Sequence, residues 1–176
     1  ALPILKMVLI GKVNKEIVAG LHVAGVEAVG LSGDDGRLIE ATKATSSEGD
    51  LGWVGEVARI NPAILSHLEE FVPVVASVGV DDEGQSYNIN ADTVAGALAA
   101  ALGARRVIFL TDVEGVYGDY PDPATLIAKC SLGDVEAMLA SDSIDAGMIP
   151  KLSAVRDALT GGVEAAQIVD GRVPHS

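Results

Sequence analysis

One stretch constrains this chain more than any other. It is the segment YNINADT at residues 87–93, which opens an alanine-rich run ending at Gly103. A run of Ala, Leu, Val and Gly is typical of a helix that is buried over most of its surface. Three polar side chains, from Asn88, Asn90 and Asp92, crowd its entrance. Because buried polar groups need partners, these side chains must find them within the fold or in a ligand.

Two interpretations of this helix start are open. In the first, Asn90 is the N-cap, and Asp92 faces the unpaired N–H groups at the positive end of the helix dipole. In the second, the segment belongs to a binding site. Asn88 favours the second interpretation, because it lies outside the cap and four residues before Asp92. Both side chains can then point at one ligand.

A second polar cluster follows the next apolar segment. Residues 106–110, RVIFL, predict a strand of the buried parallel type, which ends at Thr111 and Asp112. Open α/β sheets bind ligands beyond the carboxyl ends of their strands. We therefore predict that residues 111–117 line a ligand site, with a capped crossover loop as the alternative.

The remaining pattern predicts further helices and strands. Helices are expected at residues 4–22, 61–70, 131–139 and 148–159, and strands at residues 26–31, 72–79 and 163–169. The charged residues of the first helix are expected on a solvated face. Residues 37–43 and 51–60 alternate like the arms of a β-hairpin, which is either the rim of a substrate cleft or a surface decoration.

Helix termini add three candidate residues. Asn61 and Ser131 are expected to cap the second and third predicted helices. Lys151 falls in the first turn of the last predicted helix, where a cation opposes the helix dipole. An anion should therefore compensate Lys151, either a bound phosphate or an Asp side chain.

Composition favours one fold class and excludes several partners. Only 3% of the residues are aromatic and 49% are hydrophobic, so the core must consist of Val, Ile, Leu and Ala, as in parallel strands covered by helices. A length of 176 residues favours one domain. The formal net charge of −13 argues against nucleic acid or an anionic membrane surface as a partner. An anionic substrate would need local positive charge from only 12 Lys and Arg, which makes Lys151 a candidate.

Cysteine and histidine usage restricts the chemistry further. Cys130 is the single cysteine, so no internal disulfide forms and a reducing compartment such as the cytoplasm is expected. No His lies near it in sequence, which favours packing or a surface position over catalysis. No histidine falls in a motif, and no apolar run approaches the ~18 to 20 residues of a membrane span.

Three motifs, read together, resemble the N-acetylglutamate kinases of the amino acid kinase family. They are YNINAD at residues 87–92, LTDVEGV at residues 110–116 and GMIPK at residues 147–151. The likeness extends to MVLIGKVNKE at residues 7–16 and VDGRVPHS at residues 169–176. The resemblance implies an α/β fold, a three-layer α/β/α sandwich with a mainly parallel sheet, formed by residues 1–176 as a single amino acid kinase-like domain.

The resemblance also implies that family segments precede and follow this chain. The N-terminal phosphate-loop segment of the family, its Arg-Val-Thr segment that grips the substrate and its C-terminal strands have no counterpart in residues 1–176. Because part of the phosphate site would then be missing, residues 1–176 alone are expected to be inactive.

The implied reaction is ATP-dependent phosphorylation of the side-chain carboxylate of N-acetyl-L-glutamate. By the resemblance, Lys151 would stabilise the transition state, Asp92 would hold that lysine, and Asn88 would bind the acetylglutamate. The nucleotide would contact Thr111, Asp112, Val113, Glu114, Gly115, Val116, Tyr117, Ser143, Ile144, Asp145 and Met148. Mg²⁺ would be held mainly by the phosphates of ATP and by water, so no protein metal site is expected. The attacking carboxylate is already ionised at pH 7, so no general base is needed.

The implied partners are N-acetyl-L-glutamate and ATP. The family resemblance implies a homodimer or homohexamer, located in the cytoplasm, or in the plastid stroma of a plant. Related enzymes stay open as alternatives, namely the aminoadipate kinases, aspartokinase and uridylate kinase. A regulatory or assembly module without catalysis is another alternative, against which the joint presence of Lys151, Asp92 and Asn88 argues.

Overall fold

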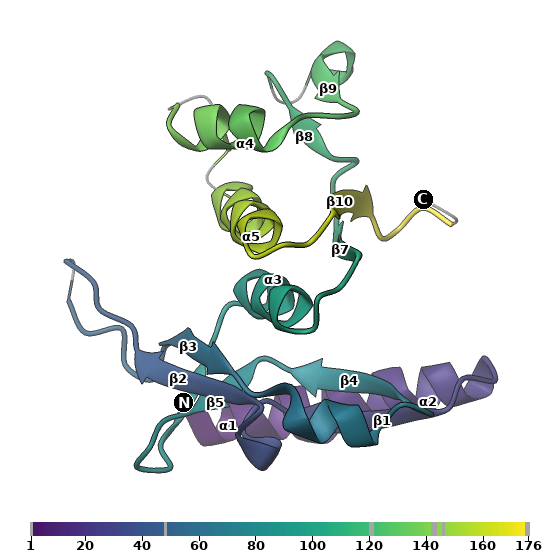
Figure 1. Ribbon diagram of the computed structural model, residues 1–176, viewed down its shortest axis with the longest axis vertical. Coiled ribbons are helices and arrows are strands. Elements are labelled where there is room, and N and C mark those ends of the chain that lie inside the picture. The colour runs from purple at the N-terminus through teal and green to yellow at the C-terminus, as the bar shows by residue number, and fades with distance from the viewer. Residues whose placement is uncertain (1, 48, 120–121, 142–143, 146, 175–176) are drawn as a thin grey trace. The chain divides into compact units, whose positions relative to one another are not determined.

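The structure, a computed structural model, describes residues 2–47, 49–119, 122–141, 144–145 and 147–174. Helices and strands alternate along the chain, which confirms the predicted α/β class (Figure 1). The chain divides into two compact units, Ala1–Val94 and Ala95–Ser176. Helix α3, Ala91–Ala101, begins in the first unit and ends in the second.

The first unit opens with a continuous helical segment that is not uniform. It consists of α1 (Leu2–Lys6), the π-helical η1 (Met7–Val13) and α2 (Asn14–Val23). The helix predicted at residues 4–22 is therefore confirmed. The π turn was not predicted, and it is marked by the hydrogen bond from the Asn14 N–H to the Leu9 carbonyl, five residues back.

The inward face of this helix differs from the predicted apolar face. Asn14 is buried, whereas Ile4, Val8 and Ile17 are exposed. The Asn14 amide donates hydrogen bonds to the carbonyls of Leu31 (3.2 Å) and Val74 (2.7 Å). An amide that joins two strands thus anchors the helix, and apolar periodicity alone did not reveal it.

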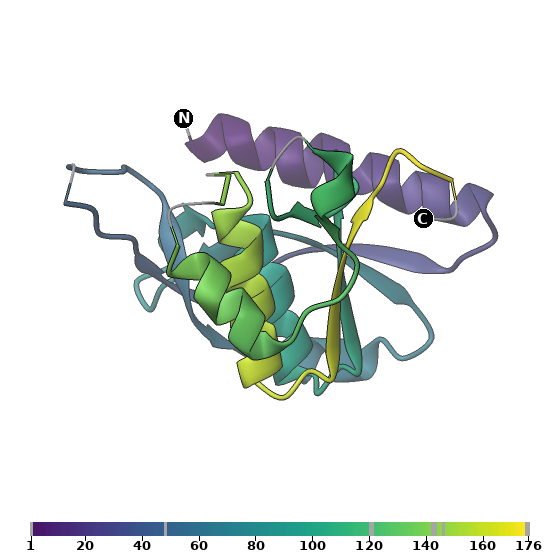
Figure 2. The same ribbon diagram turned by 90° about the horizontal axis from the view of Figure 1, so that it is seen from above.

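The strands that Asn14 joins form a parallel pair. They are β1 (Ala28–Ser32) and β4 (Val72–Ala76). The helical segment lies along this pair (Figure 2). The strand predicted at residues 72–79 breaks at Ser77, and its second half, β5 (Val78–Val80), belongs to a different sheet.

That second sheet has four strands in the order β3-β2-β5-β6. Their bounds are β2 Ile39–Lys43, β3 Gly55–Ile60, β5 Val78–Val80 and β6 Ser86–Asn88. The antiparallel pairing of β2 with β3 confirms the predicted hairpin. Two 3-10 helices, η2 (Asp35–Arg37) and η3 (Pro62–His67), complete the unit. Asn61 caps η3 as predicted, but the segment is a short 3-10 helix where an α-helix was expected.

The second unit is built on another parallel strand pair. Besides most of α3, its elements are β7 (Arg106–Thr111), β8 (Val116–Tyr117), η4 (Pro123–Thr125), β9 (Leu126–Ile127), α4 (Leu132–Leu139), α5 (Ile149–Thr160) and β10 (Ala165–Asp170). β7 pairs with β10 in parallel, and β8 pairs with β9 in antiparallel. Ser131 caps α4 through a capping box, as predicted at this position.

The core of the second unit lies between its helices and the inward side of β7. It contains Ala99, Val107, Phe109, Val116, Val135, Leu152, Ala154, Val155, Ala158 and Val163. Gly96 permits α3 to approach α5 closely, because a Cβ atom at this position would lie 2.8 Å from the Ala154 carbonyl oxygen. β7 was expected to be buried on both faces, but Ile108 and Leu110 are exposed at 53% and 68%. Within the described residues, therefore, only one face of this strand is covered.

The helices also bear on membrane insertion. In the part of the chain that the structure describes, none is both long enough and apolar enough to cross a bilayer.

Candidate functional site

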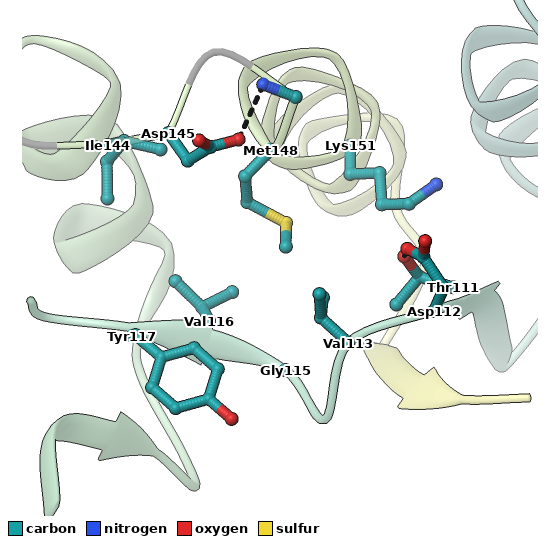
Figure 3. A pocket seen from close by; sticks show the side chains of 11 residues that line it. Thr111, Asp112, Val113, Gly115, Val116, Tyr117, Ile144, Asp145, Met148 and Lys151 are labelled. Carbon is teal, nitrogen blue, oxygen red and sulfur yellow. Dashed lines mark hydrogen bonds between the residues drawn. The ribbon is translucent and has the colours of Figure 1, made fainter. Parts of the chain in front are cut away.

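A pocket of about 270 Å³ lies in the second unit, where β7 ends and α5 begins (Figure 3). We call it the strand-end pocket. It is lined by Thr111, Asp112, Val113, Gly115, Val116, Tyr117, Ile144, Asp145, Gly147, Met148 and Lys151. The position agrees with the rule that α/β sheets bind ligands beyond the carboxyl ends of their strands.

Backbone hydrogen bonds fix the strand side of this pocket. Thr111 is the last residue of β7 and lies opposite Asp170 at the end of β10. The Gly171 N–H donates to the Thr111 carbonyl at 2.9 Å, which extends the pairing by one residue. The chain then leaves the sheet at Asp112, so the side chains of Thr111 and Asp112 stand at the mouth of the strand pair.

An ion pair supports the end of β10 next to Thr111. The Arg172 guanidinium donates two hydrogen bonds to the Asp170 carboxylate, at 2.9 Å and 2.8 Å, and the Arg172 N–H donates a third at 2.9 Å. These bonds, led by those of the guanidinium, lower the pKa of Asp170 from its ordinary value of 3.8 to about 2. Asp170 is therefore ionised at physiological pH, as its ion pair with Arg172 requires.

The helix side of the pocket is shaped by a turn at Asp145. Its carboxylate accepts a hydrogen bond from the Gly147 N–H at 2.8 Å, and its carbonyl accepts one from the Met148 N–H at 2.9 Å. Both bonds tighten the chain just before α5 begins. Lys151 follows in the first turn of α5 and extends toward the side of the pocket that carries Thr111 and Asp112 (Figure 3).

The pocket has a mixed chemical character. Val113, Val116 and Met148 present an apolar surface to its middle, and Tyr117 forms one wall (Figure 3). The polar groups of Thr111, Asp112 and Lys151 gather at the other end. This arrangement suits a ligand with a flat, weakly polar ring and an anionic group, since the ring can bury its faces while the ammonium attracts the charge.

Most of the predicted nucleotide-binding residues meet in this pocket. Glu114 does not line it, and its carboxylate accepts a hydrogen bond from the Tyr117 hydroxyl at 2.9 Å. Ser143 lies outside the described residues. Gly147 lines the pocket but was not among the predicted nucleotide-binding residues, although the motif GMIPK contains it. That these residues bind a nucleotide stays a prediction.

The first unit holds a second, larger concavity, a groove of about 740 Å³ that contains Asn88. We call it the helix-hairpin groove. It is lined by Leu2, Ile4, Leu5, Val8, Leu9, Leu51, Gly52, Trp53, Val54 and Asn88. The Asn88 N–H donates to the Trp53 carbonyl at 2.8 Å, so the end of the hairpin is fastened to β6. The hairpin therefore forms a rim beside Asn88, which favours the first of its two predicted roles.

The start of α3 confirms the cap interpretation of the YNINADT segment and leaves the binding-site interpretation open. The Thr93 N–H donates to the Asn90 side chain at 3.1 Å, so Asn90 is an N-cap. Asp92 lies in the first turn of the helix, and Asn88 lies before the cap at the end of β6. Asn88 and Asp92 belong to the first unit and Lys151 to the second. Their convergence at one cleft stays a prediction.

Metal ligands and the cysteine thiol are the remaining groups that could form a site. Among the described residues, no group of three or more His, Cys, Asp or Glu side chains is arranged to hold a metal ion. Cys130 is an exposed residue. Partial desolvation of its thiol raises the pKa, and the nearby Asp134 carboxylate raises it further. A raised pKa keeps the thiol protonated, which argues against a nucleophilic role.

Comparison with known proteins decides the family. The model of the amino acid kinase family matches residues 1–170. The chain belongs to the amino acid kinase family. Its curated relatives include the acetylglutamate kinase of Moorella thermoacetica, 50% identical over 98% of this chain and 62% of the relative, and the chloroplastic acetylglutamate kinase of Arabidopsis thaliana, 50% identical over 98% of this chain and 50% of the relative. The chain thus spans between half and two thirds of the length of these relatives.

Solved structures agree with the amino acid kinase assignment. The protein smu.665 from Streptococcus mutans matches with a TM-score of 0.82 at 30% identity, over 94% of this chain and 66% of that one. N-acetylglutamate synthase from Neisseria gonorrhoeae, complexed with coenzyme A and N-acetyl-glutamate, matches with a TM-score of 0.79 at 21% identity, over 94% of this chain and 38% of that one, and supports the fold alone. The predicted fold class and the predicted relationship to the N-acetylglutamate kinases are both confirmed.

Proposed function

We propose that the protein transfers the γ-phosphoryl group of ATP to the side-chain carboxylate of N-acetyl-L-glutamate, a step of arginine biosynthesis. The observation that carries this proposal is the strand-end pocket, in which the LTDVEGV and GMIPK motifs meet around Lys151. The relatives at 50% identity that are named acetylglutamate kinase support the choice of acceptor.

The nucleotide is assigned to the strand-end pocket. Its base would pack among the apolar side chains of Val116 and Met148, and its phosphates would extend toward Lys151. The pocket offers one hydroxyl and one carboxylate beside that ammonium, from Thr111 and Asp112, which fits a nucleotide whose Mg²⁺ is held mainly by phosphates and water. When bound, Mg²⁺ would neutralise phosphate charge.

The acceptor is assigned to the side of Asn88, whose carboxamide can hydrogen-bond acetylglutamate. A carboxylate oxygen of the acceptor attacks the γ-phosphorus, the bond from that phosphorus to the β,γ-bridging oxygen breaks, and ADP leaves. The acceptor is already ionised, so the protein needs no base to activate it. Its contribution is to position both substrates and to place positive charge where the transferred group becomes negative.

Lys151 and Asp92 have distinct roles in this scheme. Lys151 stabilises the negative charge that builds up on the nucleotide side during transfer. Asp92 holds the lysine by a charge-assisted hydrogen bond and so fixes its direction. The scheme requires Asn88, Asp92 and Lys151 to meet at one cleft, and residues 1–176 to act as one amino acid kinase-like domain. A homodimer or homohexamer in the cytoplasm, or in the plastid stroma, completes the proposal.

The test is ADP release by the full-length protein with Mg-ATP and one acceptor at a time. The panel contains N-acetyl-L-glutamate, N-acetyl-aminoadipate, aspartate and uridine monophosphate. The proposal predicts the highest kcat/KM with N-acetyl-L-glutamate. A higher value with another acceptor would reassign the substrate, and no ADP release with any of them would favour a regulatory module.

A further inference from the structure

Three polar groups from distant parts of the first unit form a closed cluster. The Lys6 ammonium lies 2.5 Å from the Asp34 carboxylate and donates to the Ser86 hydroxyl at 2.9 Å. The Ser86 hydroxyl in turn donates to the same carboxylate oxygen of Asp34 at 3.1 Å. We call this cluster the Lys6 clamp.

The clamp ties together three elements that are far apart in the sequence. Lys6 is the last residue of α1, Asp34 follows β1, and Ser86 is the first residue of β6. The side chains of Lys6 and Asp34 are only 33% and 18% exposed. An ion pair that is shielded in this way and shares a third hydrogen-bonding partner is held more firmly than a pair on an open surface.

The titration behaviour of Asp34 agrees with this geometry. Burial by itself raises the pKa of the carboxyl group, but the hydrogen bonds from Lys6 and Ser86 and the charge of Lys6 contribute to a net lowering of it. The carboxylate therefore stays charged at neutral pH and keeps its hold on Lys6.

The clamp lies on the strand that carries Asn88. β6 has only three residues, Ser86–Asn88, and successive side chains of a strand point to opposite faces, so Ser86 and Asn88 share a face. The helical segment that supplies Lys6 also supplies Leu5 and Leu9 to the helix-hairpin groove, which contains Asn88. One end of β6 is thus fixed to the helix that forms a wall of the groove.

The backbone hydrogen bonds of β6 have a different role from the clamp. β6 pairs with β5 through Val78 opposite Asn88, and the Asn88 N–H is taken by Trp53. Those backbone bonds set the register of β6 within its sheet. They do not involve the helical segment. The hydrogen bond from the Lys6 ammonium to the Ser86 hydroxyl joins that segment to β6.

We propose that Lys6 is a positioning residue for the acceptor substrate, because it fixes β6, and with it Asn88, against the helical wall of the groove. This inference rests on the proposed function for its assignment of Asn88 to the acceptor. The sequence pattern had placed Lys6 on a solvated face, so the role comes from the structure alone.

Charge exchange in the full-length protein tests the clamp. The variants are Lys6→Glu, Asp34→Lys and the double variant that carries both. Each single variant places like charges together, so KM for acetylglutamate should rise by about tenfold, because a small displacement of a substrate-binding group has a large effect. KM for ATP should change by less than about twofold. The double variant restores an ion pair, and a serine hydroxyl can donate to and accept from either partner. It should therefore recover most of the loss.

The matched control is Lys12→Glu, which makes the same charge change at an exposed position of the same helical segment. It should leave both KM values within about twofold of the parent. If the single variants behave like this control, the clamp has no positioning role. Equal losses for ATP and acetylglutamate, or no recovery in the double variant, would also overturn the proposal.

A readout that needs no activity separates this inference from the proposed function. Hydrogen exchange of a peptide covering residues 86–89 should be faster in each single variant and slow again in the double variant. Unchanged exchange in the single variants would overturn the clamp. If the variants show this exchange pattern but the parent protein does not phosphorylate acetylglutamate, the clamp is sustained and the proposed acceptor is refuted.

Discussion

At the scale of single residues, Lys151 carries the most weight in the proposed chemistry. It lies in the first turn of α5 and lines the strand-end pocket. Replacement by Ala in the full-length protein should lower kcat by about two to three orders of magnitude, because charge stabilisation of the transition state is lost. KM for ATP should change much less. Arg156→Ala, on the same helix, is the control, and an unchanged kcat in Lys151→Ala would remove this lysine from the mechanism.

Asn88 and Asn90 allow the two interpretations of the helix start to be separated experimentally. Asn90 caps α3, so Asn90→Ala should lower the free energy of unfolding by about 1 kcal/mol and have a small effect on KM. Asn88 lies outside the cap, so Asn88→Ala should mainly raise KM for acetylglutamate. Denaturant unfolding and steady-state kinetics measure the two effects. An Asn88→Ala variant that selectively weakens ATP would contradict the assignment.

The pKa of Asp170 gives a residue-scale prediction about pH. It is about 2 in the folded protein against an ordinary value of 3.8. Because the folded-state value is depressed, the ionised carboxylate favours the folded state above pH 3.8, and this contribution is lost as the pH falls through about 2. In Arg172→Gln the folded-state pKa should move back toward 3.8. An NMR titration of the Asp170 carboxyl carbon measures it, and an unchanged value would contradict the role of Arg172.

At the scale of elements, two helical glycines should respond in opposite ways to the same substitution. A Cβ at Gly96 would lie 2.8 Å from the Ala154 carbonyl oxygen, so Gly96→Ala should destabilise the fold by roughly 1 to 3 kcal/mol. Gly20 lies in α2, and apart from its chain neighbours and the backbone of its own helix nothing lies within 4 Å of such a Cβ, so Gly20→Ala should stabilise by roughly 0.5 to 1 kcal/mol. Thermal unfolding of both variants checks this. A stabilised Gly96→Ala would show that α3 and α5 are not in close contact.

The elements also show what the sequence could and could not predict. The caps at Asn61, Asn90 and Ser131 were predicted correctly, because a cap depends on residues within one turn of the helix. The prediction of an apolar inward face for the first helix was wrong. It is set by Asn14 and Lys6, whose partners are strand carbonyls, a carboxylate and a hydroxyl far away in the sequence. Periodicity contains no information on such partners.

The same distinction applies to the candidate site. The LTDVEGV and GMIPK motifs predicted most of the strand-end pocket, because each motif adopts a local turn at the end of a strand or at the start of a helix. Glu114 is absent from the lining, and its carboxylate accepts a hydrogen bond from the Tyr117 hydroxyl, a choice between neighbours that the motif does not encode. Its contact with a nucleotide stays a prediction. The Lys6 clamp was missed because it is made by tertiary contacts only.

At the scale of the whole molecule, the proposed reaction needs residues from both compact units. The proposed acceptor side lies in Ala1–Val94 and the proposed nucleotide side in Ala95–Ser176. Residues 1–176 carry a formal net charge of −13, which disfavours anionic substrates, so the few cations in this part of the chain that face a site have a large influence on binding. Replacement of Lys151 therefore tests the proposed reaction as a whole.

The most direct test is to trap the product of the full-length protein with hydroxylamine, which converts an acyl phosphate into a hydroxamate. With Mg-ATP and N-acetyl-L-glutamate, we expect one hydroxamate for each ADP released, and almost none from the Lys151→Ala variant. ADP release without hydroxamate would mean that the phosphoryl group goes elsewhere than to a carboxylate. That result would contradict the proposed function.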